Sequence, residues 1–412
     1  MKVTITPFNA AGRISAPPSK SFAHRYIIAA FLSGKKCVIE RVGNSDDVNA
    51  TVNAIKSLGG SIERSGDDVT VFAGTPVNNV TVDCSESGST LRFLLPIAAA
   101  LGITAEFTGS GRLMSRPIED LARSVEGHGA CVFGHKTEGK LKSGTYYLDA
   151  SLSSQFVTGM LFALSVLDGE SEIILKGEKV SKGYIDITLS VLKEFGVKVA
   201  ETESGFKVTG GFNPPEKVTV EGDWSGAAFP LSIGALTGSV TVENLKYPTL
   251  QSDGAIAEIL RKFGAEVSVS CNAVTVQKRA LKGIDEINCQ DFPDIAQVIT
   301  SVAAFCCGET RLTGIERLKI KESDRIAAII NTLKTCGIKA VYDGESLTVY
   351  GGKPKGGVFD GGKDHRTVMS AAVISSAADG ISEITQAEYC AKSYPDFFND
   401  VKSLGGKLDV GI

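Results

Sequence analysis

Apolar positions along the chain follow one pattern that returns six times. In each copy, an amphipathic helical pattern ends at a glycine, and a short stretch with the apolar alternation of a strand follows. The glycines recur every 67 to 73 residues. Because glycine readily takes the left-handed conformation that ends a helix, six such glycines at near-constant spacing predict a repeated unit. They are Gly59, Gly129, Gly196, Gly264, Gly337 and Gly405.

A second helical pattern precedes each amphipathic one. These segments are rich in Ala, Leu and Ile over most of their surface, so we expect them to be buried helices. Each is followed by another strand-like stretch, such as CVIERV or SEIILKG. The unit therefore reads strand, buried helix, strand, amphipathic helix and two strands. The buried segments are FAHRYIIAAFLSG, STLRFLLPIAAALG, SSQFVTGMLFALSVLDG, SGAAFPLSIGALTG, PDIAQVITSVAAFCCG and HRTVMSAAVISSAADG.

The two ends of the chain fit together in this pattern. The sixth copy has only KLDV after its glycine, whereas the first copy has two strands, and KVTITP at residues 2–7 can supply the missing one. Six units then form two α/β domains of three βαβαββ-type repeats each. We expect an N-terminal domain over residues 15–223 and a discontinuous C-terminal domain over 1–14 and 224–412. Linkers are expected near residues 12–18 and 221–225.

Length and composition agree with two domains and narrow the partners. A chain of 412 residues is long enough for two cores of roughly 200 residues. The net charge of -4 argues against a general nucleic-acid binder. No apolar run reaches the ~20 residues of a membrane span, and the N-terminus has no signal-peptide pattern. The nine cysteines are scattered without a C-x-x-C pair, which favours reduced thiols in the cytoplasm over disulfides or zinc.

Cations gather where helices begin, which is unfavourable unless an anion offsets them. The buried helices start with polar stretches such as PSKS, ESGST, SLSSQ and KDHR. Ser or Asp there can cap a helix, but a cap does not require a neighbouring Lys or Arg. Helix N-termini with added cations favour a ligand that carries several negative charges, such as phosphates and carboxylates. The cations are Lys20, Arg25, Arg92, Arg116, Lys321, Arg325, Arg366 and Lys392.

The segment KIKESDRI at residues 319–326 carries two interpretations at once. Ser323 is a suitable N-cap for the helix that follows, and Asp324 suits the positive end of the helix dipole. We therefore expect these two residues to cap the helix. Lys321, Glu322 and Arg325 are expected to face the ligand instead.

These motifs together resemble the 5-enolpyruvylshikimate-3-phosphate synthase family from about Pro18 to Phe397. The stretches that carry the resemblance are PSKSFAHR, SGSTLRF, GRLMSRPIEDL, SSQF, SKGYIDIT, FPDIAQV, KIKESDRI, KDHR and AKSYPDF. The resemblance implies two similar three-repeat domains with the active site in the cleft between them. It implies transfer of the enolpyruvyl group of phosphoenolpyruvate to the 5-hydroxyl of shikimate 3-phosphate, with release of phosphate. It implies no metal or organic cofactor.

The resemblance also assigns residues to the two substrates. Those matching shikimate 3-phosphate contacts are Lys20, Ser21, Arg25, Ser153, Ser154, Gln155, Ser181, Tyr184, Asp294, Arg317 and Lys321. Those matching phosphoenolpyruvate contacts are Lys20, Gly88, Arg116, Gln155, Arg325, Arg366 and Lys392. Three positions depart from the common family pattern, namely Glu86, Gly183 and Arg317, and they suggest a divergent branch.

Enolpyruvyl transfer needs one proton added to a methylene carbon and one removed from the attacking hydroxyl. Two carboxyl groups tuned to different tasks can serve this cycle. We expect Asp294 to act as base on the 5-hydroxyl and Glu322 to exchange the proton at the methylene carbon. Lys20 is expected to stabilise the bridging oxygen and the leaving phosphate.

Two alternatives stay open at the level of sequence. The other enolpyruvyl transferase, which uses UDP-N-acetylglucosamine as acceptor, shares the fold, but its members generally carry a cysteine in the loop that reads GSGRLMSRP here. A non-catalytic anion-binding repeat protein would explain the cations but would leave Asp294 and Glu322 without a task. We expect a monomer that acts on small molecules, with no nucleic-acid or membrane partner.

Overall fold

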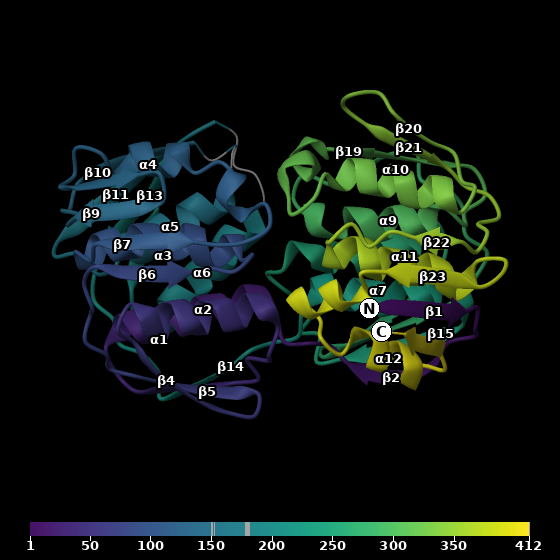
Figure 1. Ribbon diagram of the computed structural model, residues 1–412, viewed down its shortest axis with the longest axis horizontal. Coiled ribbons are helices and arrows are strands. Elements are labelled where there is room, and N and C mark those ends of the chain that lie inside the picture. Colours follow the sequence, from purple (N-terminus) through teal and green to yellow (C-terminus); the bar gives the residue numbers. More distant parts are fainter. Residues whose placement is uncertain (150, 152, 178–181, 412) are drawn as a thin grey trace. The chain divides into compact units, whose positions relative to one another are not determined.

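The chain forms two compact units in a computed structural model that describes residues 1–149, 151, 153–177 and 182–411. One unit contains Met1–Pro17 and Glu221–Ile412, and the other contains Pro18–Val220 (Figure 1). The chain passes from one unit to the other between Pro17 and Pro18 and again between Val220 and Glu221.

Strands of the described residues form six four-stranded sheets with one shared topology. In each sheet an edge strand runs parallel to its neighbour, and the other two strands continue the sheet with antiparallel pairing. Parallel neighbours need a crossover connection, and a buried helix makes it directly in four of the six sheets. In the other two sheets, the parallel edge strand lies where the chain passes between the units and is far from its neighbour in sequence. The predicted repeat of four strands and two helices is thereby confirmed.

Three of these sheets belong to the unit Pro18–Val220, and their strands are given in spatial order. The first contains β14 (Lys217–Thr219), β3 (Cys37–Glu40), β5 (Asp68–Phe72) and β4 (Ser61–Ser65). The second contains β6 (Val80–Asp83), β7 (Ala105–Thr108), β9 (Lys136–Gly139) and β8 (Ala130–Phe133). The third contains β10 (Thr145–Asp149), β11 (Glu170–Lys176), β13 (Gly205–Thr209) and β12 (Lys198–Glu201).

The other three sheets belong to the unit that holds both chain ends. The first contains β2 (Ala11–Ser15), β15 (Ser239–Glu243), β17 (Ala273–Gln277) and β16 (Glu266–Val269). The second contains β18 (Ile287–Asn288), β19 (Glu309–Thr313), β21 (Leu347–Tyr350) and β20 (Ala340–Tyr342). The third contains β22 (Val358–Phe359), β23 (Ser382–Thr385), β1 (Lys2–Thr6) and β24 (Lys407–Gly411).

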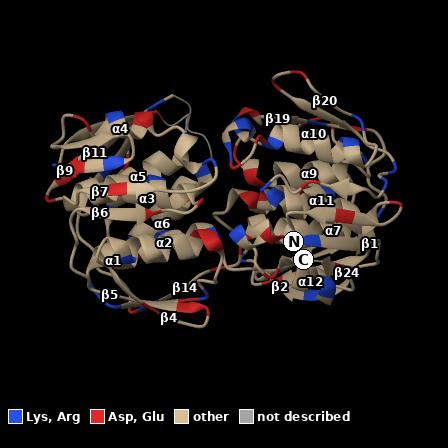
Figure 2. Cartoon of the chain, in the orientation of Figure 1, with Lys and Arg blue, Asp and Glu red and all other residues tan. Residues whose placement is uncertain are grey.

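Inner helices form the core of each unit. All the residues of α7 are buried, which agrees with its uniformly apolar sequence. In Figure 2 the inner helices are tan along most of their length, with charged residues near the ends. They are α1 (Lys20–Ser33), α3 (Gly88–Leu101) and α5 (Ser154–Leu164) in one unit, and α7 (Trp224–Thr237), α9 (Ala296–Ala303) and α11 (His365–Ala377) in the other.

Outer helices lie one per repeat and are buried on one face only. In α8, for example, Ile259 and Leu260 are buried while Glu258 and Arg261 are exposed. Short 3-10 helices lead into several helices or replace part of them: η1 (Leu113–Ser115), η2 (Ser252–Ala255), η3 (Pro293–Ile295), η4 (Glu316–Ile320) and η5 (Ala387–Lys392). The outer helices are α2 (Asp46–Ser57), α4 (Glu119–Val125), α6 (Lys182–Glu194), α8 (Ile256–Phe263), α10 (Arg325–Thr335) and α12 (Phe397–Ser403).

The six glycines that mark the repeat all have positive φ, between 76° and 110°. Gly59 shows why no other residue fits well at its position: a Cβ atom there would lie 1.9 Å from the carbonyl oxygen of Thr75. The helix-ending role is confirmed for five of these glycines. Gly129 is the exception, because α4 already ends at Val125 and a turn separates it from Gly129.

The N-terminal strand completes the sheet of the last repeat. Strand β1 pairs antiparallel with both β23 and β24, with Lys2 opposite Gly411 at one end. In Figure 1 the purple β1 accordingly lies among the yellow C-terminal elements. The prediction that residues 2–7 supply the missing strand is confirmed, with the strand ending at Thr6.

The first predicted linker is partly wrong. Residues 12–15, which were expected to be linker, belong to strand β2, whose backbone pairs in parallel with β15. The sequence AGRIS hides this strand because it holds a glycine and only one buried side chain. The second linker is shorter than expected, since Asp223 already caps α7. No helix among the described residues is long and apolar enough to cross a membrane.

The position of β1 inside its sheet predicts that a truncation of one of its side chains destabilises the unit that contains both chain ends. Ile5 is fully buried, so Ile5→Ala should lower the free energy of unfolding by about 2–5 kcal/mol. Lys2→Ala, on an exposed side chain, is the control and should change it by less than about 0.5 kcal/mol. Urea unfolding followed by the fluorescence of Trp224, the sole tryptophan, reports on this unit. Equal midpoints for the two variants would contradict the packing described for β1.

Candidate functional site

A fully buried guanidinium organises the charged residues of the unit that holds both chain ends. Arg325, at the start of α10, is 1% exposed and donates hydrogen bonds to three carboxylates. The donor–acceptor distances are 2.9 Å from Nε to Asp364, 3.1 Å from Nη1 to Asp294 and 2.9 Å from Nη2 to Glu322. Burial alone would lower the pKa of Arg325, but the three carboxylates outweigh burial and raise this pKa above its ordinary value. Arg325 is therefore charged at any pH at which the protein folds.

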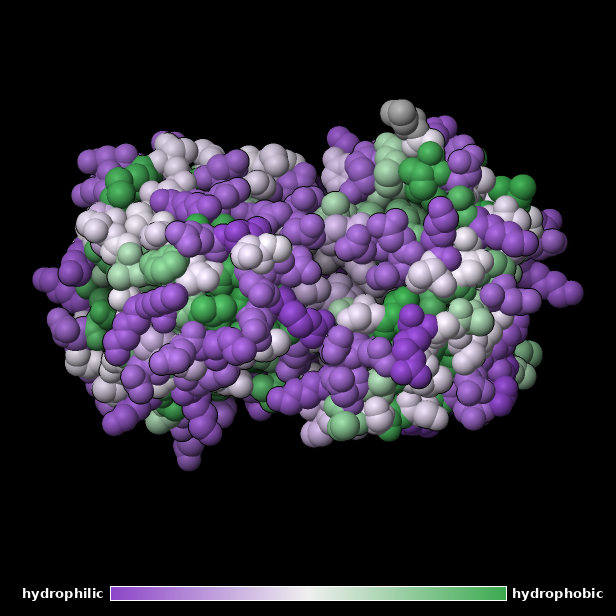
Figure 3. All heavy atoms as spheres, turned by 90° about the horizontal axis from the view of Figure 1, so that it is seen from below, coloured by the Kyte–Doolittle hydropathy of each residue, from purple (hydrophilic) through white to green (hydrophobic). Residues whose placement is uncertain are grey.

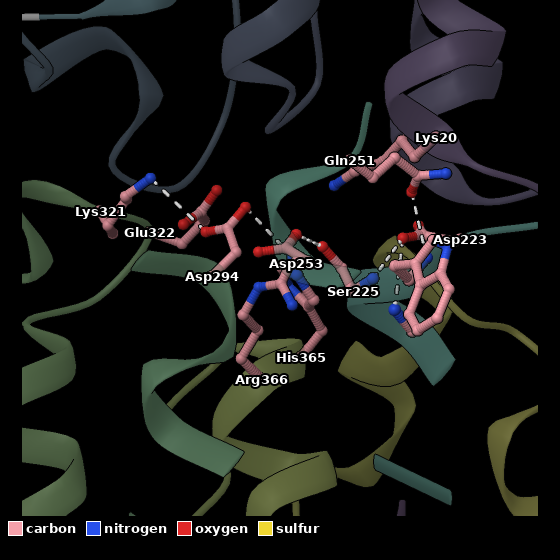
Figure 4. A network of polar contacts seen from close by, with 12 residues as sticks. Lys20, Asp223, Ser225, Gln251, Asp253, Asp294, Lys321, Glu322, His365 and Arg366 are labelled. Carbon is pink, nitrogen blue, oxygen red and sulfur yellow. Dashed lines mark hydrogen bonds and ion pairs between the residues drawn. The ribbon is translucent and has the colours of Figure 1, made fainter. Parts of the chain in front are cut away.

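Asp294 is the residue on which the cations of this cluster converge. Its carboxylate lies 3.1 Å from Arg325, 3.2 Å from Arg366 and 3.5 Å from the Lys321 amine. Burial would raise the pKa of Asp294, but Arg366, Lys321 and Arg325 together lower it well below its ordinary value. The carboxylate is ionised at neutral pH, and its side chain remains 21% exposed. Figure 4 shows Asp294 between Lys321 and Arg366.

Lys321 differs from the arginines because its charge depends on pH near neutrality. Burial lowers the pKa of Lys321 to about 8, although Asp294 raises it. Arg325 and Arg317 add positive charge nearby and lower the pKa of Lys321 as well. An anion bound beside Lys321 would oppose this effect and hold the amine in its charged form.

The predicted capping roles in this segment need one correction. Asp324 is the N-cap of α10, and its carboxylate accepts a hydrogen bond from the backbone N–H of Ala327. Ser323, which was expected to cap the helix with Asp324, instead donates to the carboxylate of Asp364 at 2.8 Å. One residue suffices as the cap, and the buried carboxylate attracts the neighbouring hydroxyl.

Asp364 was missed as a site residue by the sequence argument, which read KDHR as a helix start. It is fully buried, caps α11 through the N–H of Arg366, and binds Arg325. Burial would raise the pKa of Asp364, but Arg325 lowers it below the ordinary value. Its double role fixes the start of α11 to the start of α10, so it positions Arg366 relative to Arg325.

In the unit Pro18–Val220, the predicted residue Arg25 is held by uncharged groups. It is 3% exposed and donates to the hydroxyl of Thr188 at 2.8 Å and to the carbonyl oxygens of Ser21 at 2.7 Å and Tyr184 at 3.0 Å. Its guanidinium also lies 5.1 Å from the ring centroid of Phe93. Burial lowers the pKa of Arg25 to about 9, and Tyr184 opposes the shift. Among the described residues, its hydrogen-bond partners are hydroxyl and carbonyl oxygens.

A second group in this unit joins Gly88, Arg116 and Gln155. A Cβ atom at Gly88 would lie 2.6 Å from Nη1 of Arg116, so the guanidinium rests against the bare backbone at the start of α3. Arg92 donates to Gln155 at 2.8 Å and to the carbonyl oxygen of Pro117, next to Arg116, at 3.1 Å. Gln155 in turn donates to the hydroxyl of Ser89 at 3.1 Å. Arg92, which the sequence argument counted among the cations at helix starts but assigned to neither substrate, links the residues of this group.

Lys20 and the start of α3 are supported by buried polar contacts. The Lys20 amine lies 2.6 Å from the carboxylate of Asp47 in the first turn of α2. One helical turn further along α1, Nδ1 of His24 lies 2.7 Å from the hydroxyl oxygen of Thr51. That hydroxyl oxygen lies 2.6 Å from the hydroxyl oxygen of Thr90. Thr90 donates to Ser87, the N-cap of α3. Hydrogen bonds thus connect α2 with α1 and α3, the two helices that carry predicted site residues.

The other predicted residues are placed as follows. Ser153 is the N-cap of α5 and accepts from the N–H of Gln155, and Ser154 is buried beside it. Lys392 is 3% exposed at the end of η5. Ser181 lies outside the described residues. Within the described ranges, no group of His, Cys, Asp and Glu is arranged to hold a metal ion.

Each unit therefore offers cations at helix starts for anionic groups, and one unit adds carboxylates next to them. Asp294 and Glu322 are ion-paired with arginine yet partly exposed, at 21% and 17%, so both can reach a ligand. Such a set can bind phosphate and carboxylate groups and can take up or deliver protons beside them. It supports acid–base chemistry on a small polyanionic substrate.

Comparisons with known proteins agree over the whole chain. The sequence pattern of the family described as EPSP synthase (3-phosphoshikimate 1-carboxyvinyltransferase) matches residues 6–401. The chain is 38% identical to a 3-phosphoshikimate 1-carboxyvinyltransferase of Clostridium kluyveri, over 99% of this chain and 98% of that relative. A protein of the same name from Clostridioides difficile is 37% identical, over 98% of each chain.

Solved structures share the fold. An EPSP synthase from Acinetobacter baumannii matches with a TM-score of 0.83 at 25% identity, over 99% of this chain and 100% of that one. The enolpyruvyl transferase NikO from Streptomyces tendae has the same fold at a TM-score of 0.78, with 16% identity. The repeated sheets around buried helices thus define the fold of the enolpyruvyl transferases. Within that class, the chain belongs to the EPSP synthase (3-phosphoshikimate 1-carboxyvinyltransferase) family.

The ion cluster around Arg325 predicts a large and pH-dependent cost for removing one carboxylate. Asp364→Asn leaves a buried guanidinium without one of its three carboxylate partners and should lower the free energy of unfolding by about 3–5 kcal/mol at pH 7. Because the folded-state pKa of Asp364 is lowered, its contribution is present above the ordinary carboxyl pKa and is lost as the pH falls through the folded-state value. The gap between wild type and variant should therefore narrow below about pH 4.

Denaturant unfolding between pH 3 and 8 measures this gap. Ser323→Ala is the matched control, because it removes a neutral hydrogen bond to the same carboxylate and should cost only about 1 kcal/mol. A gap for Asp364→Asn that stays constant down to pH 3 would show that ionisation of Asp364 does not contribute to stability.

Proposed function

We propose that this chain transfers the enolpyruvyl group of phosphoenolpyruvate to the 5-hydroxyl of shikimate 3-phosphate and releases phosphate. It is a transferase by family membership, and the family description names 3-phosphoshikimate as the acceptor. The reaction belongs to the shikimate pathway of aromatic amino acid biosynthesis. The observation that carries the proposal at the level of residues is the cluster in which Asp294 and Glu322 share buried cations.

The unit Pro18–Val220 is proposed to bind shikimate 3-phosphate through Lys20, Ser21, Arg25 and neighbouring residues. The support is electrostatic: Arg25 is a buried cation whose described hydrogen-bond partners are all neutral, so the phosphate of a ligand would give it a countercharge. The full proposed set is Lys20, Ser21, Arg25, Ser153, Ser154, Gln155, Ser181 and Tyr184, with Asp294, Arg317 and Lys321 from the other unit.

Phosphoenolpyruvate carries a phosphate and a carboxylate, and the proposed residues offer arginine forks for both. Arg325 and Arg366 converge on Asp294, whereas Arg116 rests against Gly88. Planar guanidinium groups bind such anions in two-pronged fashion. The full proposed set is Lys20, Gly88, Arg116, Gln155, Arg325, Arg366 and Lys392.

Substrate binding would also make Asp294 a stronger base. Three cations lower the pKa of Asp294, which makes the carboxylate a poor proton acceptor until substrates bind. Anionic groups that engage Arg366 and Lys321 neutralise part of that positive charge, so the pKa of Asp294 rises toward its ordinary range. The base is thus activated when both reactants are in place.

The chemical steps can be assigned to these groups. Asp294 takes the proton of the 5-hydroxyl as its oxygen bonds to C2 of phosphoenolpyruvate, and Glu322 gives a proton to C3. The tetrahedral adduct then loses phosphate from C2, and the departing phosphate takes the proton that Asp294 had accepted. At the same time a proton leaves the new methyl group to Glu322, which restores the double bond. Lys20 is proposed to stabilise the bridging oxygen and the departing phosphate. Asp47, at 2.6 Å, holds its amine in place.

We further propose a monomeric, cytoplasmic enzyme whose functional halves are residues 15–223 and residues 1–14 with 224–412. The compact units, Pro18–Val220 and the remainder, support this division to within three residues at each boundary. On the face in Figure 3, apolar residues form small groups between hydrophilic ones, which supports a monomer. All nine cysteines are free thiols, and six of them are buried, which supports a reducing compartment.

A phosphate-release assay tests the reaction directly. Purified protein with phosphoenolpyruvate should release phosphate when shikimate 3-phosphate is present and should release none with UDP-N-acetylglucosamine as acceptor. The product, identified by mass, should be shikimate 3-phosphate plus one enolpyruvyl group. Release with the nucleotide sugar alone, or no release with either acceptor, would refute the proposed function.

The base role predicts that Asp294→Asn loses turnover more than affinity. An amide cannot take the hydroxyl proton, so kcat should fall by about 10²–10⁴-fold. The KM for shikimate 3-phosphate should change far less, because the cations that bind the anions remain. Steady-state kinetics measure both values, and thermal unfolding verifies that the variant is folded. Near-normal kcat would exclude Asp294 as the base.

The contact at Gly88 predicts a selective loss of phosphoenolpyruvate affinity. In Gly88→Ala the new methyl group would lie 2.6 Å from Arg116, so the guanidinium must move. The KM for phosphoenolpyruvate should rise by about tenfold or more, equivalent to about 1.4 kcal/mol, with little change in KM for shikimate 3-phosphate. The control Ser89→Ala removes only the hydroxyl next to it. An unchanged KM for phosphoenolpyruvate in Gly88→Ala would separate Arg116 from that substrate.

A further inference from the structure

Asp253 is a buried carboxylic acid beside the ion cluster that no step of the proposed mechanism uses. It lies in η2, is 3% exposed, and accepts a short hydrogen bond from the hydroxyl of Ser225 in the first turn of α7. Figure 4 shows Asp253 with Ser225 on one side and with Asp294, His365 and Arg366 on the other. It thus lies beside Arg366, which we assign to phosphoenolpyruvate.

Charged groups from three elements act on Asp253. Asp294 comes from η3, Arg366 from α11, and Asp223 from the residue before α7. Burial is the largest influence and raises the pKa of Asp253 to about 7, with Asp294 and Asp223 acting in the same direction and Arg366 and Ser225 in the opposite one. His365, which neighbours Arg366 in sequence, is a further titratable group on this side. Asp253 is therefore divided between its two protonation states near neutral pH.

We propose that Asp253 is a positioning residue that gates anion binding at Arg366 by exchanging one proton with solvent. When no anion is bound, the ionised carboxylate attracts Arg366 and competes with a ligand for it. When an anion engages Arg366, Asp253 takes up a proton, becomes neutral and no longer repels the ligand. The inference rests on the proposed function only in naming phosphoenolpyruvate as the anion.

The balance of charge in the cluster favours this role. In the described part of the cluster, the carboxylates of Asp294, Glu322 and Asp364 match the cations Lys321, Arg325 and Arg366. Each of those three carboxylates contacts Arg325 directly, and the cations lower the pKa of Asp294 and of Asp364. Asp253 is a fourth carboxyl group, and its burial raises its pKa. A proton is therefore accommodated at Asp253 more easily than at Asp294 or Asp364.

Proton uptake on ligand binding is the direct test. Titration calorimetry with phosphoenolpyruvate at pH 7, in buffers of different ionisation enthalpy, gives the number of protons taken up. Wild type should take up a fraction of a proton more than Asp253→Asn, because only wild type can protonate Asp253. Any proton taken up by the ligand itself is the same for both proteins and cancels in the comparison. Equal uptake by the two proteins would overturn the proposal.

The pH profile of affinity gives a second readout that a purely structural role would not change. Above pH 7 the wild-type KM for phosphoenolpyruvate should rise relative to that of Asp253→Asn, by up to about tenfold per pH unit, with little difference in kcat. Ser225→Ala removes the donor that favours the ionised form, so it should shift this rise to higher pH. A constant ratio of KM values across pH 6–9, or a shift to lower pH in Ser225→Ala, would contradict the proposal.

A measurement without substrate separates this proposal from the proposed function. Because the folded-state pKa of Asp253 is raised, its ionisation should reduce wild-type stability as the pH rises from about 4 to about 7, and no further above that. The melting temperature of wild type relative to Asp253→Asn should fall over that window. If the protein lacked transferase activity but showed this fall, the proposed function alone would fail. If it had activity but showed neither this fall nor extra proton uptake, the role of Asp253 would fail.

Discussion

The burial of the Arg325 guanidinium is the constraint on which the arrangement of the charged site depends. A charge that is 1% exposed is tolerated only when carboxylates surround it, and here they come from three separate segments. Asp294 precedes α9, Glu322 precedes α10 and Asp364 caps α11. The requirement to satisfy one arginine thus fixes the starts of three helices. Because Asp294 also binds Arg366 and Lys321, the same requirement sets the charge state of the residue proposed as the base.

The other unit solves the same problem with neutral groups. Arg25 and Arg92 are both buried, yet their hydrogen bonds go to hydroxyl, carbonyl and amide oxygens. Aromatic faces add to this, since Arg25 lies 5.1 Å from the centroid of Phe93 and Arg92 lies 5.5 Å from that of Phe156. Cations with neutral partners retain their attraction for an anion, whereas those in the Arg325 cluster must exchange one anionic partner for another. The two units therefore bring different electrostatics to the proposed substrates.

Much of the fold could be predicted from sequence because a repeat multiplies a weak signal. One helix-ending glycine means little, but six at regular spacing define a unit, and the incomplete sixth unit points to β1. Strand β2 could not be predicted, because only one of its five side chains is buried and the apolar alternation of a strand is therefore missing. The strand is held instead by backbone pairing with β15, which is distant in sequence. Local sequence carries no information on such a partner.

The site was predicted unevenly for a similar reason. Lys321, Glu322 and Arg325 stand together in one polar segment, so their type and spacing drew notice, and the structure brings them to Asp294. Asp364 was taken for an ordinary cap, and Asp253 lies in a stretch with no motif at all. Their significance comes from neighbours that are distant in the chain: Arg325 is 39 residues from Asp364, and Ser225 is 28 residues from Asp253. Ser323 shows the limit of capping rules. Its hydroxyl donates to the buried carboxylate of Asp364 and does not cap α10.

The position of β1 imposes an order on biosynthesis. Residues 18–220 contain every strand of their own three sheets, so this half of the protein can complete its core while the ribosome is still translating the remainder. Strand β1 has no such opportunity, since both of its neighbours, β23 and β24, are made long after it. It must therefore wait, unpaired, until residues 382–411 have been made before its sheet can close.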